Sequence, residues 1–84
     1  QLQFTRALSV IGSLLAAGAI QPTASEKLTL YGLYKQATEG DCHLPRPSSR
    51  QVGMFAKWRA WDRLRGISPA EAQKYYVDTL LELL

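Results

Sequence analysis

Two tyrosines and a lysine are spaced for one helical face in the segment LYGLYKQATEGD, residues 30–41. Tyr31, Tyr34 and Lys35 stand at i, i+3 and i+4, so their side chains project from one side of a helix. Leu28 and Thr38 extend that face by a turn in each direction. Phenol rings beside an ammonium group form a surface on which a base stacks while a phosphate is neutralised. The alternative is the edge of a hydrophobic core, where a lysine meets water.

Positive charge is concentrated in one part of the chain. The 84 residues carry a net charge of +3, yet residues 46–65 hold six basic side chains against Asp62 alone. Residues 1–45 are neutral overall, and residues 66–84 are acidic. This distribution predicts an anionic partner, and a solvated helix face is the alternative.

The sequence offers few side chains that could support catalysis or bind a metal. Glu39, Asp41, Cys42 and His43 are close together in sequence, but they fall in an expected loop without an orienting partner. Cys42 is the only cysteine, which excludes an internal disulfide, and with the only histidine it is too small a set for a metal site. We therefore expect no enzyme activity, no catalytic residue, no metal and no cofactor.

Two helices must position the tyrosine face and its surroundings. The first is expected over residues 2–15, because apolar residues recur there at helical spacing: Phe4, Ala7, Leu8, Ile11, Leu14 and Leu15. The apolar run at residues 7–20 is shorter than the roughly 20 residues that span a bilayer, so a core helix explains it better. The second helix is expected from a capping box at Thr23 and Glu26 to about Thr38, with Gly40 as the stop.

Two further helices follow a proline-containing loop at residues 39–50. The third is expected over residues 51–64, with Gly66 at its end and four candidate buried side chains: Phe55, Trp58, Trp61 and Leu64. The fourth begins with Ser68 at the N-cap and Pro69 at the first helical position. An apolar stripe then follows at Ala72, Tyr76, Leu80 and Leu84. The chain is predicted to form one all-α domain over residues 1–84, monomeric and cut from a longer protein.

The order of two sequence blocks resembles the acyl-CoA-binding protein family, and the resemblance covers almost the whole chain. The first block is Tyr-x-x-Tyr-Lys-Gln-Ala-Thr-x-Gly-Asp, present at residues 31–41. The second is Lys-Trp-x-Ala-Trp, present at residues 57–61, and the late tyrosine of the family matches Tyr76. The resemblance implies a four-helix up-down-down-up bundle that binds long-chain acyl-CoA without changing it chemically.

The resemblance also implies a role for individual residues. Residues matching Tyr31, Lys35 and Lys57 gather around the 3′-phosphate of the coenzyme, the match of Tyr34 packs on adenine, and that of Tyr76 closes the pocket. Gly32 and Leu33 belong to the same predicted binding block. The acyl groove or its rim is expected to include Ile11, Gly12, Ser13, Leu14, Leu15, Ala16, Ala17, Gly18, Ala19, Ile20, Leu28 and Arg50. Gly12 stands where many short members carry a lysine, and Arg50 is the candidate to compensate for a basic residue lost near Met54.

The connection between the first two helices is longer than in short members of the family. It is similar to that of membrane-tethered, peroxisome-associated members, which implies a cytosol-facing domain with any tether outside this sequence. We expect no nucleic-acid partner. The alternative function is a basic helical module, suggested by KWRAWDRLR at residues 57–65, that binds nucleic acid or an anionic protein or membrane surface.

Overall fold

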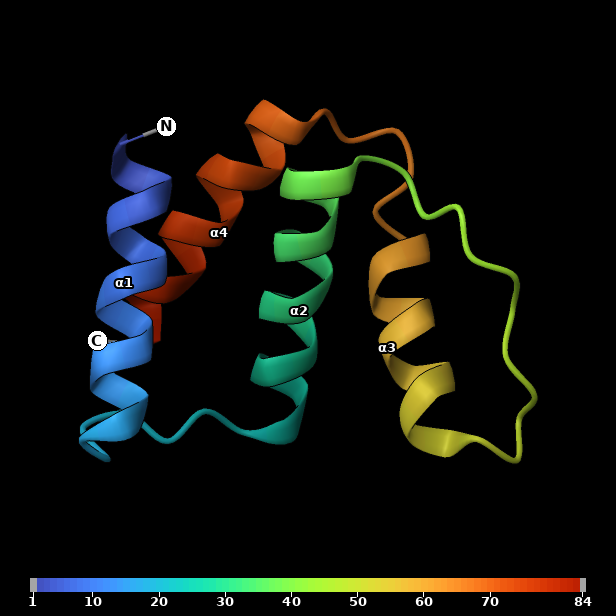
Figure 1. Ribbon diagram of the computed structural model, residues 1–84, viewed down its shortest axis with the longest axis horizontal. Helices are drawn as coiled ribbons and strands as arrows, with labels where there is room; N and C mark the ends of the chain where they lie inside the picture. Colours follow the sequence, from blue (N-terminus) through green and yellow to red (C-terminus); the bar gives the residue numbers. More distant parts are fainter. Residues whose placement is uncertain (1, 84) are drawn as a thin grey trace.

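The computed structural model describes residues 2–83 and contains four helices in this range and no strand. They are α1 (Leu2–Ala16), α2 (Ala24–Glu39), α3 (Val52–Asp62) and α4 (Pro69–Leu83). In Figure 1, α1 and α4 run downward whereas α2 and α3 run upward, which is an up-down-down-up arrangement. Because α2 and α3 are parallel, the long connection after Glu39 must return along the molecule before α3 begins. The predicted all-α bundle is confirmed.

Side-chain caps fix the starts of α2 and α4. Thr23 Oγ1 accepts a hydrogen bond from the amide of Glu26 at 3.1 Å, and the Glu26 carboxylate accepts one from the Thr23 amide at 2.8 Å. The Ser68 hydroxyl similarly accepts from the Glu71 amide at 3.1 Å. These bonds satisfy amides that have no partner in the first helical turn. Both starts agree with the sequence prediction.

The end of α3 differs from the prediction. The helix stops at Asp62 rather than Leu64, and residues 63–66 form tighter turns. The amide of Leu64 donates to the Trp61 carbonyl at 3.0 Å, and that of Arg65 donates to Asp62 at 3.1 Å. Such i to i−3 bonds replace the α-helical pattern in a closing turn. Gly66 then adopts a positive φ of 93°, as its position after the helix suggested.

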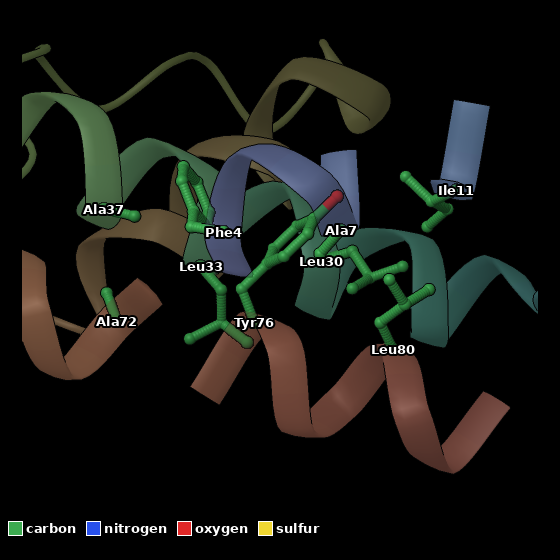
Figure 2. Close-up of a cluster of buried hydrophobic side chains, with 9 residues drawn as sticks. All are labelled: Phe4, Ala7, Ile11, Leu30, Leu33, Ala37, Ala72, Tyr76 and Leu80. Atoms are coloured by element: carbon green, nitrogen blue, oxygen red, sulfur yellow. The ribbon is translucent and has the colours of Figure 1, made fainter. Parts of the chain in front are cut away.

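The hydrophobic core lies between α1, α2 and α4. Figure 2 shows its buried side chains: Phe4, Ala7, Ile11, Leu30, Leu33, Ala37, Ala72, Tyr76 and Leu80. Helix α2 is central, since it packs against both α4 and α3, whereas α1 packs against α4. Leu84, predicted to complete the α4 stripe, lies outside the described residues.

Two predictions about buried side chains need correction. Leu15 was expected on the buried face of α1, yet it is 45% exposed because it borders a hollow that opens to solvent. Of the candidates on α3, Trp61 is completely buried, whereas Phe55, Trp58 and Leu64 are partly buried. Helix α3 packs on α2 alone among the helices, so only a narrow part of its surface is covered.

A hydrogen-bonded junction holds the ends of α2 and α3 together. The buried Gln36 side chain donates to Asp41 Oδ1 at 2.9 Å and to the Ile67 carbonyl at 2.7 Å. Asp41 Oδ1 also accepts from the Gly66 amide at 2.9 Å, and the Trp61 indole donates to the Gly40 carbonyl at 2.8 Å.

Within residues 2–83, no helix combines the length and apolar character needed to cross a membrane.

Candidate functional site

An apolar hollow of about 300 Å³ opens beside the core and is lined by three helices and the α1–α2 connection. Its lining residues are Ile11, Leu15, Pro22, Lys27, Leu30, Tyr31, Tyr34 and Tyr76. Ile11 and Leu15 are one turn apart on α1, and Leu30 and Tyr34 are one turn apart on α2. Helical periodicity on two elements therefore contributes to the lining of the same hollow.

Aromatic contacts with Phe4 position two of the three tyrosines of this hollow, Tyr34 and Tyr76. The Phe4 ring stacks with Tyr34 at a centroid distance of 6.5 Å and meets Tyr76 edge to face at 5.3 Å. Figure 2 shows the Tyr76 ring projecting from α4 toward Ala7 and Leu30. Tyr76 is 5% exposed, and this burial, with a smaller contribution from Tyr34, raises the pKa of its phenol. Tyr34 is 40% exposed, so its ring offers an accessible aromatic face.

Lys57 joins the site from α3. Its Nζ lies 5.6 Å from the centroid of the Tyr31 ring, which is within the range of a cation–π contact. Tyr31 also lines the hollow, so one phenol connects the apolar surface with an ammonium group. Charged and apolar features of the candidate site meet at Tyr31.

Lys35 lies on the α3 side of α2 and does not line the hollow. Its Nζ is 5.3 Å from the Trp61 ring centroid and donates to Glu39 Oε2 at 2.7 Å. This hydrogen bond is the main reason that the pKa of Lys35 is raised and that of Glu39 is lowered. An anionic ligand that recruits Lys35 would therefore meet an ammonium group that already donates to the Glu39 carboxylate.

The remaining predicted residues fall into three groups. Gly32 and Leu33 are buried in helix packing rather than in the hollow, and a Cβ at Gly32 would lie 2.3 Å from the Ala60 carbonyl oxygen. Ile20 lines a separate, smaller hollow with Glu26 and Glu82. None of the following lines the apolar hollow: Gly12, Ser13, Leu14, Ala16, Ala17, Gly18, Ala19, Leu28 and Arg50.

Sequence reasoning missed Pro22, Lys27 and Leu30 as lining residues. It extended the tyrosine face along Leu28 and Thr38, whereas the hollow follows the neighbouring row through Lys27, Leu30 and Tyr34. Helical spacing alone does not choose between these rows, because each contains Tyr31 or Tyr34 with neighbours three or four residues away. The signal in the sequence was the apolar Leu30, four residues before Tyr34, which indicates the side of α2 that faces the core.

Fold and hollow together define a small helical domain in which an apolar recess lies beside aromatic rings and lysines. The chain belongs to the family described as acyl CoA binding protein, whose pattern matches residues 1–80.

Individual relatives support this membership. The chain is 38% identical over 81 residues to acyl-CoA-binding domain-containing protein 1 of Arabidopsis thaliana and 41% identical over 83 residues to acyl-CoA-binding domain-containing protein 5 of Gallus gallus. These matches cover 95% and 98% of the chain but only 24% and 17% of the relatives' length. The acyl-CoA-binding protein of Dictyostelium discoideum is 47% identical over 57 residues, which is 68% of each protein.

Solved structures show the same fold. The crystal structure of ACBP from Moniliophthora perniciosa superposes with a TM-score of 0.89 at 39% identity, covering 98% of this chain and 77% of that one. Acyl-CoA-binding protein 2 of Oryza sativa gives a TM-score of 0.83 at 32% identity, covering 99% and 88%.

Proposed function

We propose that this domain binds long-chain acyl-CoA and releases it chemically unchanged, as a carrier, pool-former or sensor. The observation that carries the proposal is the apolar hollow lined by Tyr31, Tyr34 and Tyr76, with Lys57 against the first of these rings. Family membership and the names of the relatives point to the same ligand class. An acyl-CoA combines an apolar tail with a phosphorylated, aromatic headgroup, which matches this combination of side chains.

The tail provides a large share of the expected binding free energy. Removing a methylene from water contributes about 0.8 kcal/mol, so a sixteen-carbon chain contributes on the order of 12 kcal/mol before ordering costs. The lining of the hollow by Ile11, Leu15 and Leu30 suits such a chain. We propose that tail length sets affinity, whereas the headgroup residues set orientation.

Headgroup recognition is assigned to tyrosines and lysines from α2, α3 and α4. We propose that Tyr31, Lys35 and Lys57 surround the 3′-phosphate, that Tyr34 packs on adenine and that Tyr76 closes the hollow. Lys57 can bind a phosphate without first releasing a carboxylate, because its described contact among residues 2–83 is with the Tyr31 ring. Lys35 would exchange Glu39 for a phosphate oxygen, or share its donors between them.

Titration calorimetry with palmitoyl-CoA, free palmitate and coenzyme A tests the proposal. We expect palmitoyl-CoA to bind at least about tenfold more tightly than either fragment, because tail and headgroup contribute together. Equal affinity for palmitoyl-CoA and palmitate would remove the nucleotide part of the argument. Equal affinity for palmitoyl-CoA and coenzyme A would remove the part played by the hollow.

The proposal extends to partners and location. We propose a monomeric, non-catalytic domain that faces the cytosol and does not use nucleic acid as its ligand. We also propose a tether to the peroxisomal membrane through another segment, and its one support is the resemblance of the α1–α2 connection to that of membrane-tethered members of the family. Competition between palmitoyl-CoA and a labelled oligonucleotide separates this function from that of a basic nucleic-acid-binding module, which would also show strong salt dependence.

A further inference from the structure

A second hollow, of about 370 Å³, lies on the outer side of α3, away from the apolar one. We call it the arginine groove, and its lining residues are Arg46, Phe55, Trp58, Arg59, Asp62 and Arg63. It shares no lining residue with the apolar hollow, and none of its residues belongs to the proposed headgroup set. The groove is therefore a surface that acyl-CoA binding does not explain.

The charge of the groove is not neutralised within the domain. The ion pairs described for residues 2–83 leave Arg46, Arg59 and Arg63 without a carboxylate partner. Asp62, the one acidic lining residue, already accepts a hydrogen bond from Arg65 Nη2 at 2.9 Å. Three guanidinium groups thus face one carboxylate that is engaged elsewhere.

Aromatic rings give the groove defined walls. The Phe55 and Trp58 centroids are 5.9 Å apart, and the Arg46 guanidinium lies 5.1 Å from the Phe55 centroid. The Trp58 indole donates to the Leu44 carbonyl at 2.9 Å, which ties the ring to the α2–α3 connection. Figure 1 shows this connection running alongside α3 at the right-hand edge of the molecule. The groove is thus a concave surface whose rings are positioned before any partner arrives.

We propose that the arginine groove binds an extended acidic segment of a partner protein. Arg59 and Arg63 are one helical turn apart, with Cβ atoms about 5–6 Å from each other, whereas alternate side chains of an extended segment are about 7 Å apart. Two acidic residues at alternate positions therefore reach both guanidinium groups, which match carboxylates with paired hydrogen bonds. An aromatic residue at the next alternate position packs on Phe55 and Trp58.

Concavity favours a peptide over a lipid bilayer as the occupant. A flat membrane contacts rings and cations that project from a protein, whereas Phe55 and Trp58 line a recess. A narrow segment enters such a recess and exposes its carboxylates to the arginines that line it. Charge complementarity then provides orientation and register.

Fluorescence anisotropy with a labelled GESESFG peptide tests the inference in the intact domain. We expect measurable binding at low salt, and a loss of affinity of about tenfold or more for the peptide GQSQSFG, which lacks the charges. We expect the double variant Arg59→Gln, Arg63→Gln to lose affinity similarly. The matched control is Arg6→Gln, Lys74→Gln, which removes the same charge from exposed positions outside both hollows.

Three outcomes would overturn the inference. They are equal binding of the two peptides, equal losses in the two double variants, and Arg59- and Arg63-dependent binding to phosphatidylserine-containing vesicles without peptide binding. Palmitoyl-CoA affinity is measured on the same proteins and should remain unchanged in both double variants. If the wild-type protein does not bind palmitoyl-CoA, the proposed function is wrong, but the peptide result still decides whether the arginine groove binds an acidic segment.

Discussion

Tyr31 is the residue at which the two halves of the candidate site meet. Its ring lines the apolar hollow from α2, and the Lys57 ammonium of α3 lies 5.6 Å from the ring centroid. A phosphate placed near Lys57 would therefore be adjacent to a surface that also reaches the acyl tail. The contribution of each lysine to such a site follows from what else that lysine contacts.

Replacing Lys57 with Gln should weaken palmitoyl-CoA binding by about tenfold, because the proposed charge-assisted contact to a phosphate would be lost. Lys57 is exposed and has no ion-pair partner within residues 2–83, so the melting temperature should be almost unchanged. Calorimetry and thermal denaturation measure the two quantities. The exposed Lys74→Gln variant is the control, and an equal loss of affinity there would mean that only net charge matters.

At the residue scale, the sequence predicted part of the lining of the apolar hollow. It placed Tyr31 and Tyr34 on one surface, and both line the hollow together with Tyr76. It also grouped Lys35 with them, whereas the structure holds that side chain between Glu39 and Trp61. Helical spacing specifies which side chains share a face, but the neighbouring helix decides which edge of that face is covered.

Among the elements, α2 and α3 come into close backbone contact at Gly32. A Cβ there would lie 2.3 Å from the Ala60 carbonyl oxygen and 2.8 Å from its carbon, which are backbone atoms that cannot rotate away. Sequence patterns alone provide no reason for this glycine, because nothing local distinguishes a close helix crossing from a flexible position. The Thr23 and Ser68 caps, by contrast, depend on residues three apart and were predictable.

Gly32→Ala should therefore destabilise the domain by about 1–3 kcal/mol, since the helices must separate to admit the methyl group. Gly12→Ala is a matched control, because Gly12 lies within α1 and a Cβ added to it would meet nothing within 4 Å. There the better helix propensity of alanine should stabilise the protein by up to about 1 kcal/mol. Urea denaturation measures both, and equal changes would contradict the proposed close contact.

The Asp41 junction makes the connection between elements sensitive to acid. Hydrogen bonds from the Gly66 amide and then from Gln36 lower the pKa of Asp41 below its ordinary value of 3.8. Asp41 binds a proton more readily in the unfolded chain than in the folded one. The stability that its carboxylate contributes is therefore fully present above the ordinary pKa of 3.8 and is lost as the pH falls through the lower pKa of the folded state.

Asp41→Asn should consequently melt at a lower temperature than the wild type at pH 7. The difference between the two proteins should shrink as the pH falls below about 4, because the wild-type carboxylate becomes neutral. Thermal denaturation of both proteins across this pH range gives the difference in melting temperature at each pH. Glu39, whose pKa is also lowered, is present in both proteins, so its contribution cancels in that difference. A difference independent of pH would show that the charge of Asp41 does not stabilise the junction.

Over the whole molecule, two surfaces of different character are built by different helices. The apolar hollow is lined from α1, α2 and α4, whereas the arginine groove is formed by α3 and the connection before it. The sequence predicted the four helices and the basic segment that supplies this groove. The positions of the hollow and the groove depend on contacts between distant segments, which composition and periodicity do not specify.

Occupancy of the apolar hollow should stabilise the whole domain in proportion to ligand affinity. A ligand at one hundred times its Kd adds about 2.7 kcal/mol to the free energy of unfolding, provided that the unfolded chain does not bind it. Palmitoyl-CoA should therefore raise the melting temperature more than octanoyl-CoA at equal concentration. The eight additional methylenes contribute up to about 6 kcal/mol of gross transfer free energy.

Differential scanning fluorimetry below the micelle-forming concentration compares these two ligands with coenzyme A. The expected order of melting temperatures is palmitoyl-CoA, octanoyl-CoA, coenzyme A, because the headgroup is constant and only the tail changes. Equal shifts for all three would assign binding to the headgroup alone and leave the hollow without a role. If palmitate shifts the melting temperature as much as palmitoyl-CoA does, the tail alone accounts for binding. The tyrosines and lysines around Tyr31 would then have no headgroup to recognise.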